Sequence, residues 1–269
     1  MQAMETRSSA YLRGLLVLTL GFLTGPLLLV LPVSFTPKRY LSLPEGEWSL
    51  RHYAKFFTDP DWLNSALASF GIALATAILC TLLATAFVVG LWLRSERSDR
   101  YLFGLVLLPM VVPQVISSMV IFFLESRLGL LDSFAGLILA HSIMAVPYSV
   151  MALHVACSRL SRSLELASRS LGARTWQTAL FVILPNIRLG ILTSAFLAFV
   201  ISWEEVVVTL FVSGTNVITL PKRVWDGLRY NVDPVIAATA VIMMSLTVLA
   251  ILGRAAFLLW KVRRPRWSG

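Results

Sequence analysis

The feature that most constrains this chain is a series of apolar segments, most of them about twenty residues or longer and free of charge. Twenty residues of α-helix rise about 30 Å, which is the thickness of the hydrocarbon core of a bilayer. A water-soluble core would instead use shorter periodic elements. Only 14% of the residues are charged, against about 25% in an average soluble domain. The sequence therefore predicts an integral membrane protein.

We expect an all-α polytopic membrane protein with six transmembrane helices, forming a single transmembrane domain over residues 1–269. The first apolar run is longer than the core of a usual signal peptide and ends without a clear small-x-small cleavage site, so we expect it to be retained. The predicted spans lie near residues 14–36, 63–93, 101–124, 134–157, 189–212 and 234–258.

Six spans place both termini on one side of the membrane, and the basic residues indicate which side. Lys and Arg are enriched in the cytoplasmic connections of membrane proteins. With the termini in the cytoplasm, 15 of the 23 Lys and Arg residues lie inside and 8 outside. We therefore expect cytoplasmic termini, and we explain the net charge of +9 by this asymmetry rather than by binding to nucleic acid.

Motifs for the commonest enzymatic and metal chemistries are absent from the sequence. No Gly-Lys dipeptide occurs, so the chain has no phosphate-binding loop of a P-loop ATPase. His52, His141 and His154 lack metal-ligand spacing, and Cys80 and Cys157 form no C-x-x-C pair. No G-x-S nucleophile motif of an intramembrane serine protease is present. We predict no catalytic and no metal-binding residue, and we expect His52 on the surface.

The longest predicted cytoplasmic connection, residues 159–188, has the pattern of two short helices joined by a hinge. Leu164, Ala167 and Leu171 recur at helical spacing and give the first helix an apolar face. Gly172 supplies the left-handed conformation that ends a helix at little cost. The second helix, which we expect Thr175 to cap, carries an apolar face made of Trp176, Ala179, Leu180 and Ile183.

Pro185 favours an end to this second helix before the fifth span. An amphipathic helix that projects from a membrane domain suits insertion into a groove on a partner protein. On periodicity alone, an interfacial helix lying on lipid head groups is the commoner explanation.

The loop resembles the EAA loop of permease subunits of binding-protein-dependent ABC importers, whose pattern is E-A-A-x(3)-G-x(9)-I-x-L-P. Anchored on Gly172, the pattern is met by Ala167 in the first Ala position and by Leu184 and Pro185 at the end. Ser168 and Val182 are mild replacements of the second Ala and of the Ile.

The departure from the pattern is Leu166 in the Glu position, with Glu165 one residue earlier. A shift of one residue turns a helical side chain by about 100°. In this family the loop docks on the ATPase subunit and transmits its nucleotide-driven movement. The resemblance thus implies ATPase-coupling roles for Glu165, Leu166, Ala167, Leu171, Gly172, Ala173 and Pro185.

The resemblance also implies an assembly and a location. The expected partners are two ATP-binding subunits, a second and homologous permease subunit, and a periplasmic substrate-binding protein, with membrane lipid around the spans. ATP and Mg²⁺ would be bound by the ATPase partner, so we expect no cofactor in this chain. The location implied is the bacterial inner (plasma) membrane.

Three further segments resemble the polyamine-type (spermidine/putrescine) permeases. They are Ala140-His141 with Pro147-Tyr148, the run from Ser202 to Phe211, and Thr219-Leu220-Pro221. The acidic pair in those permeases usually follows Phe and begins with Asp, so Trp203 and Glu204 depart from the pattern. The implied substrate is a small organic cation such as putrescine or spermidine. The alternatives are an ABC importer of another small solute, such as an amino-acid derivative or an aminophosphonate, and a secondary transporter.

Glu204 and Glu205 lie deep within the fifth apolar run. A charged side chain at mid-membrane costs about 2.5–3.5 kcal/mol on insertion scales, and such residues are usually functional. On a continuous helix Glu205 shares a stripe with Ser194, Ala198 and Thr209, whereas Glu204 points to another face. We predict a substrate pathway lined by Ser202, Trp203, Glu204, Glu205 and Thr209. The alternative is a structural contact with a neighbouring span.

Two further expectations concern the same spans. We expect His141 to be a hydrogen-bonded packing residue between helices rather than a ligand. We expect Pro109, Pro113 and Pro147 to kink their helices.

Overall fold

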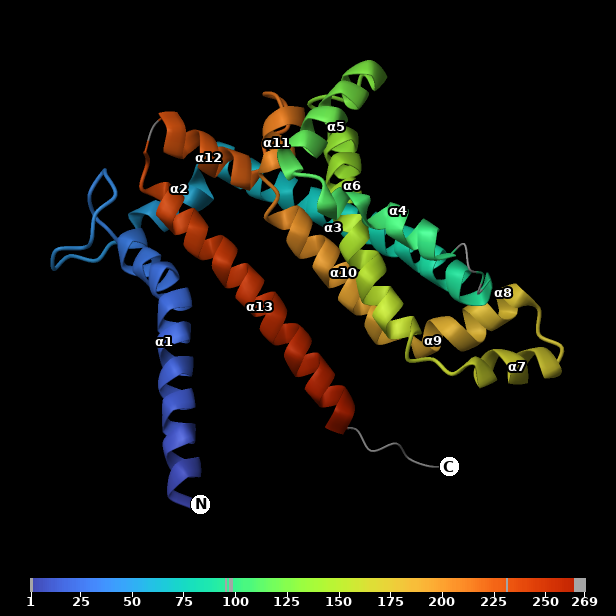
Figure 1. Ribbon diagram of the computed structural model, residues 1–269. Helices are drawn as coiled ribbons and strands as arrows, with labels where there is room; N and C mark the ends of the chain where they lie inside the picture. The colour runs from blue at the N-terminus through green and yellow to red at the C-terminus, as the bar shows by residue number, and fades with distance from the viewer. Residues whose placement is uncertain (1, 95, 97–98, 231, 264–269) are drawn as a thin grey trace. The chain divides into compact units, whose positions relative to one another are not determined.

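The computed structural model describes residues 2–94, 96, 99–230 and 232–263, and its regular elements in these ranges are all helical (Figure 1). The predicted all-α class is confirmed. The elements are α1 (Gln2–Ser34), α2 (Arg51–Thr58), α3 (Pro60–Arg94), α4 (Asp99–Val111), α5 (Gln114–Leu128), α6 (Phe134–Cys157), α7 (Arg162–Ser170), α8 (Thr175–Gln177), the π-helix Thr178–Ile183, α9 (Leu184–Asn186), α10 (Arg188–Trp203), α11 (Val207–Val212), α12 (Leu220–Tyr230) and α13 (Val235–Arg263).

The chain divides into two compact units. Unit 1 contains the chain up to Leu63 and from Asp226 onward, with α1, α2 and α13 as its main helices. Unit 2 runs from Asn64 to Trp225 and contains most of α3 together with α4 to α11.

Four helices within the described residues are each long and apolar enough to cross a membrane, namely α1, α3, α6 and α13. Two bent pairs pass the same test only when each is taken as one broken span. One pair is α4 with α5, bent by 101°, and the other is Thr175–Asn186 with α10, bent by 74°. The fold therefore offers four to six candidate membrane helices.

The third and fifth predicted spans are broken rather than straight. The third is interrupted between α4 and α5, where Pro113 has an extended backbone (φ −53°, ψ 130°) and precedes the first residue of α5. Proline has no N–H to continue the helical hydrogen bonds, which explains the break. The fifth ends at Trp203 and resumes as α11 at Val207, so the acidic pair lies between two helices.

Unit 2 is built around α6, which packs against α10, α4 and α11 (Figure 1). Small residues let α6 and α10 approach closely, because a Cβ on Gly190 would lie 2.3 Å from the Cβ of Ala156. Leu137, Ala140 and Met144 of α6 join one buried cluster, and Val150, Leu153 and Cys157 join a second.

Asp132 joins two loops of unit 2 that are distant in sequence. Its carboxylate accepts four backbone N–H hydrogen bonds, from Gly214, Thr215, Asn216 and Val217, at 2.8–3.1 Å. Its own N–H donates to the carbonyl of Val212 at 2.9 Å. Burial alone would raise the pKa of Asp132, but the four hydrogen bonds lower it below its ordinary value. We call this arrangement the Asp132 clasp.

Unit 1 places α2 beside the start of α13 (Figure 1). The hydroxyls of Tyr53 in α2 and Ser34 at the end of α1 lie 2.7 Å apart. The expectation that His52 is a surface residue is wrong. Its ring is buried, and its Nε2 lies 3.1 Å from the carbonyl oxygen of Lys38, because α2 turns this face toward the preceding loop.

Candidate coupling loop and substrate pathway

The first helix of the 159–188 loop ends as its sequence predicts. Gly172 follows α7 with φ +83°, the left-handed conformation that residues with a Cβ rarely adopt. Its N–H donates to the carbonyl of Arg169 at 2.9 Å, and the N–H of Ala173 donates to the carbonyl of Ser168 at 3.1 Å. This pair of hydrogen bonds is the Schellman motif, so the hinge has a defined geometry.

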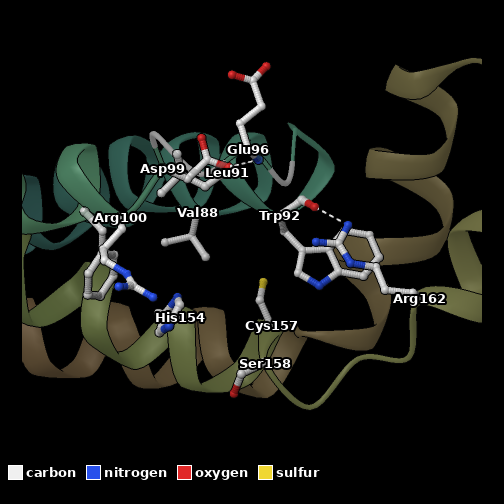
Figure 2. A pocket seen from close by; sticks show the side chains of 11 residues that line it. Val88, Leu91, Trp92, Glu96, Asp99, Arg100, His154, Cys157, Ser158 and Arg162 are labelled. Atoms are coloured by element: carbon white, nitrogen blue, oxygen red, sulfur yellow. Dashed lines mark hydrogen bonds between the residues drawn. The ribbon is translucent and has the colours of Figure 1, made fainter.

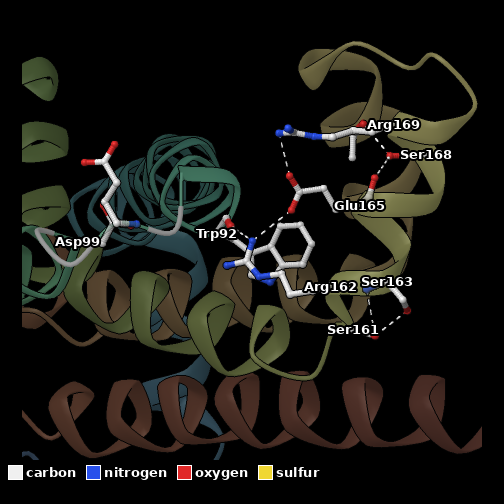
Figure 3. Close-up of polar contacts among 10 residues, drawn as sticks. Trp92, Asp99, Ser161, Arg162, Ser163, Glu165, Ser168 and Arg169 are labelled. Carbon is white, nitrogen blue, oxygen red and sulfur yellow. Dashed lines mark hydrogen bonds and ion pairs between the residues drawn. The ribbon is translucent and has the colours of Figure 1, made fainter.

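Glu165 binds basic residues of its own loop, as Figure 3 shows. Its carboxylate lies 2.8 Å from a guanidinium nitrogen of Arg169 and 3.2 Å from one of Arg162. Arg162 also donates to the backbone carbonyl of Trp92 and stacks on that indole ring, 4.3 Å from its centre. Through Arg162 the carboxylate of Glu165 is connected to the end of α3.

The face of α7 that packs on its own chain is polar. Ser168, in the second Ala position of the pattern, is buried, and its hydroxyl lies 2.9 Å from the hydroxyl of buried Thr178. The same Ser168 hydroxyl donates to the carbonyl of Glu165 at 2.8 Å. The contact with Thr178 does not follow from helical periodicity, because Thr178 belongs to the second arm of the loop.

The apolar face of α7 is exposed instead. Its predicted members Leu164, Ala167 and Leu171 are all exposed, Leu171 by 89%, and neighbouring Leu166 is 66% exposed. Pro185 is also exposed, whereas Ala173 is half-buried. Apolar side chains left open at a projecting hinge are available to contact another molecule.

The second arm of the loop differs from the prediction. Arg174, and not Thr175, is the N-cap residue of α8, and its N–H donates to the side chain of Gln177 at 2.7 Å. Residues 178–183 are π-helical, with more residues per turn than an α-helix. The buried side chains are therefore Thr178 and Ile183, whereas Trp176 and Leu180 of the predicted apolar face are exposed.

A cavity of about 480 Å³ is lined by residues of α3, α4 and the end of α6 together with Arg162, the first residue of α7 (Figure 2). Arg162 on Trp92 closes one end, and Arg100 of α4 lines another part of the wall. His154 and Cys157 line it from the end of α6. The contact between Arg162 of α7 and Trp92 at the end of α3, which Figure 3 also draws, thus belongs to the lining of this cavity.

His141 connects three elements of unit 2, as expected of a packing residue. Its Nδ1 lies 2.8 Å from the hydroxyl of Ser202, and its Nε2 lies 3.0 Å from that of Thr209. The Thr209 hydroxyl donates to the backbone carbonyl of Glu205 at 3.2 Å, so it must accept from Nε2. In neutral His141 the Nδ1 then accepts from Ser202.

Glu205 is buried, with 6% of its surface exposed, and each carboxylate oxygen is hydrogen-bonded. The side-chain amide of Gln114 donates to Oε2 at 2.6 Å, and the N–H of Val208 donates to Oε1 at 2.9 Å. Glu205 also lines a cavity of about 450 Å³ at the break between α4 and α5. The other walls come from Gln114, Met144, Tyr148, Ile201 and residues 109–113.

The other predicted pathway residues lie outside the wall of this cavity. Ser202 and Thr209 bind His141, and buried Trp203 stacks on Phe199 with ring centres 6.1 Å apart. Glu204 is exposed and Glu205 is buried, but α10 ends at Trp203, so the continuous helix from which two different faces were predicted is not present at this pair.

Sequence reasoning missed Gln114 and Tyr148 as neighbours of Glu205. The signals in the sequence are weak: Tyr148 belongs to a segment that resembles polyamine-type permeases, and Gln114 directly follows Pro113. Neither indicated a contact with the fifth span.

The family of the chain follows from comparison with known proteins. Residues 83–260 match the family described as binding-protein-dependent transport system inner membrane component. The chain belongs to this family. The match covers α6, the whole 159–188 loop and the Glu205 cavity, and it supports a transport role. It therefore sets aside the secondary transporter.

Relatives of this permease include polyamine transport proteins. It is 28% identical over 258 residues to the putrescine transport system permease protein PotI of Escherichia coli K12, covering 91% of this chain and 88% of that protein. It is 28% identical over 232 residues to the spermidine/putrescine transport system permease protein PotC of Haemophilus influenzae, covering 84% and 88%.

Solved structures show the same fold at lower identity. An importer of the acidic polysaccharide alginate matches with a TM-score of 0.61 and 17% identity, covering 97% of this chain and 98% of that chain. An amino acid ABC transporter matches with a TM-score of 0.58 and 14% identity, covering 77% and 96%. The permease therefore resembles polyamine permeases within an ABC-importer fold that serves several substrates.

Proposed function

We propose that the permease is the translocation subunit of an ATP-driven importer for a small organic cation of the putrescine or spermidine class. The observation that carries the substrate class is the buried Glu205 carboxylate in the wall of a cavity at a helix break. The polyamine names of its relatives support the same class.

A carboxylate in this position can attract an ammonium group strongly. At an effective dielectric of about 20, opposite charges about 4 Å apart interact by about 4 kcal/mol before the cost of desolvation. A net gain of about 1.4 kcal/mol changes affinity tenfold. The Tyr148 ring in the same cavity adds a face on which a cation can lie. In this proposal Gln114 and the N–H of Val208 orient the Glu205 carboxylate, and the ammonium group takes the remaining lone pairs.

The remaining pathway residues act through the helix break. Ser202 and Thr209 hold α10 and α11 to His141, and Trp203 packs beside them on Phe199. We propose that these three position Glu205, and that exposed Glu204 adds a long-range attraction for cations.

The matched pair Glu205→Gln and Glu204→Gln tests this proposal, because each removes one charge and keeps size and hydrogen bonding. We expect Glu205→Gln to weaken uptake of radiolabelled putrescine about tenfold or more, with ATPase association unchanged. Glu204→Gln should have a smaller effect, and the double variant the largest. Uptake at the parent rate by the double variant would make the carboxylates structural. A parent that carries only anions or neutral solutes would overturn the substrate class.

A neutral or zwitterionic solute is the second candidate. A relative named trehalose transport system permease protein SugB, from Mycobacterium tuberculosis, is 25% identical over 248 residues. The observation that favours this reading is that Gln114 and Val208 already occupy both Glu205 oxygens. Uptake of labelled putrescine is measured in the presence of unlabelled polyamines, amino acids or disaccharides. The class of compound that competes for uptake distinguishes the two candidates.

We also propose that α4 with α5 crosses the membrane as one broken span and that residues 189–212 cross it as another, giving six spans with cytoplasmic termini in a single transmembrane domain. Single cysteines at exposed Ser170 and Glu47 test the orientation. An impermeant thiol reagent should label the Glu47→Cys variant from the periplasm and the Ser170→Cys variant only after permeabilisation. Labelling of both from the periplasm would contradict the topology.

The exposed apolar residues of α7 support a docking role for the 159–188 loop. We propose that Leu166, Ala167, Leu171 and Gly172, with Ala173 and Pro185 nearby, contact the ATPase subunit, and that Glu165 holds α7 in shape. The partner set proposed is two ATP-binding subunits, a second permease and a periplasmic binding protein. ATP and Mg²⁺ would be bound by the ATP-binding subunits.

Replacement of Leu171 by Asp should reduce co-purification of the ATPase subunit, since it places a charge in an apolar contact. Leu43→Asp is the matched control, because Leu43 is also exposed but lies in the predicted outer loop. Equal ATPase recovery in both variants would remove the docking role from Leu171.

A further inference from the structure

Unit 1 contains a basic cavity that the transport proposal does not use. Its volume is about 610 Å³. Three of its lining side chains are permanently cationic at neutral pH, and one is a carboxylate. The lining residues are Arg39, Arg51, His52, Lys55, Thr58, Val232, Asp233 and Pro234.

The single carboxylate of this cavity is already neutralised. Lys55 donates to Asp233 at 2.5 Å. Burial alone would raise the pKa of Asp233, but the hydrogen bond from Lys55 lowers it below its ordinary value, so the Asp233 carboxyl is ionised at neutral pH. Arg39 and Arg51 are therefore the two charges that the cavity leaves uncompensated.

Both arginines keep donors available. Nη1 of Arg51 donates to the carbonyl of Pro37 at 2.9 Å, and this fixes the side chain without balancing its charge. Arg39 makes no hydrogen bond or ion pair with any residue that the structure describes. A guanidinium group presents a planar set of N–H donors that matches the oxygens of a phosphate group. The cavity thus has the chemistry of a site for a phosphate anion.

The position of the cavity indicates where this phosphate comes from. The candidate membrane helix α1 ends at Ser34 and the candidate membrane helix α13 begins at Val235. Its lining residues between 39 and 58 lie in the loop after α1 and in α2, and residues 232–234 come immediately before α13. The cavity therefore lies at the depth of the lipid head groups, whichever side of the membrane it faces.

The side chains around this position suit the interface between water and lipid. Tyr40, Trp48 and Phe57 are exposed in the same loop and in α2. Aromatic residues gather at this depth in membrane proteins because their rings are partly apolar and partly polar. The apolar window of α1 is not covered by other parts of the described chain, so acyl chains can lie against it.

We propose that this cavity binds the phosphate head group of an anionic glycerophospholipid, such as phosphatidylglycerol, with Arg39 and Arg51 contacting the phosphate. The lipid's acyl chains would extend along the exposed apolar surface of α1. Its expected function is to hold α2 and the ends of α1 and α13 together at the membrane interface. The lipid is favoured over a soluble acidic partner because the charges border a membrane helix and are surrounded by exposed aromatic residues.

The test uses the transporter purified with its partner subunits in phosphatidylcholine nanodiscs. Binding of phosphatidylglycerol is measured by native mass spectrometry as its fraction in the discs is raised. Each basic residue near an anionic lipid changes binding about fivefold. We therefore expect apparent affinity to fall about fivefold in Arg39→Gln and about 25-fold when Arg51→Gln is added. Arg39→Lys should keep most of the affinity because it keeps the charge.

The matched control is Arg127→Gln, which removes an exposed arginine at the end of α5. It should leave the affinity for phosphatidylglycerol unchanged. Equal affinity in the double variant and the parent would overturn the proposal. Competition by millimolar inorganic phosphate or glycerophosphoglycerol at the strength of the lipid would overturn it too, since the site would then bind free phosphate. The proposal would also be overturned if the double arginine variant kept the lipid affinity of the parent but docked the periplasmic binding protein more weakly.

Discussion

Two connections of unit 2 are each fastened by one carboxylate, and the partners of the two carboxylates differ. Asp132 accepts four N–H groups of the backbone at residues 214–217. Glu165 binds the side chains of Arg162 and Arg169, which are 46% and 52% exposed. The first contact fixes the path of the chain itself, whereas the second fixes only the ends of long side chains.

The physical consequence is a difference in stiffness. Backbone N–H groups cannot leave the carboxylate unless the loop changes shape, so the Asp132 clasp holds one conformation. Exposed ion pairs contribute little and exchange partners easily, because water screens the charges and the side chains lose entropy when they are held. A stiff connection suits a surface that must keep its shape, and a loosely held one suits the proposed coupling loop, which must follow the movement of a partner.

The largest expected effect is that of Asp132→Ala. Hydrogen bonds to a charged group contribute about 1.5–3 kcal/mol each, but the exposed tip of the loop can be hydrated after the loss. We expect a decrease of about 2–4 kcal/mol in the free energy of unfolding, measured on the purified protein in detergent. A decrease below about 1 kcal/mol would show that the clasp is not the main support of this loop.

The pH dependence of the clasp follows from the lowered pKa of Asp132. The stabilisation is complete above the ordinary aspartate pKa of 3.8 and is lost as the pH falls through the lower pKa of the folded protein. The unfolding free energy of Asp132→Asn should therefore decrease less than that of the parent as the pH falls, because the variant lacks this titrating carboxyl. Parallel stability curves for parent and Asn variant below pH 5 would contradict this assignment.

Gly172→Ala should have the next largest effect. A Cβ meets no atom within 4 Å at this position, so the cost comes only from φ +83°. A left-handed conformation costs a residue with a Cβ about 1–2 kcal/mol. We expect that loss of unfolding free energy together with weaker ATPase association, whereas Gly172→Asn should lose less of both. Full stability of the Ala variant would mean that the turn re-forms differently.

Ser168→Ala restores the Ala of the family pattern and removes the contact with Thr178. Buried Thr178 then lacks this partner, which should cost about 1 kcal/mol of unfolding free energy. Adding Thr178→Val removes the orphaned hydroxyl and should recover most of the loss. Additive losses in the double variant would show that the two hydroxyls are not coupled.

The smallest expected effect on stability is that of Glu165→Gln. Its two ion pairs involve half-exposed arginines, so we expect a loss of at most about 1 kcal/mol, further reduced by high salt. Transport coupled to ATP hydrolysis should fall more than stability does, because Arg162 loses one of its two supports. A stability loss as large as that of Asp132→Ala would erase the difference between the two connections.

Much of the fold could be predicted because it depends on local or single-segment properties. Runs of apolar residues define membrane helices since an isolated segment must satisfy its own backbone in lipid. Gly172 ends α7 for a reason contained in one residue. The packing role of His141 was likewise predictable from its place in an apolar run. The different burial of Glu204 and Glu205, by contrast, depends on the turn between α10 and α11 and not on helical periodicity.

The tertiary structure decided the contacts between residues that are distant in sequence. The four N–H groups around Asp132 lie 82–85 residues away, and Gln114 lies 91 residues from Glu205. The π-helix at 178–183 rotates the buried face of the second arm, which no α-helical period could anticipate. Apolar patterning by itself indicated that this chain is a membrane protein and which segments are candidate spans. Only the folded chain could show that Asp132 is held by backbone N–H groups, that Glu205 borders a cavity and that Glu165 binds the arginines of its own loop. Such pairings depend on which residues meet in space, and the linear sequence does not contain that information.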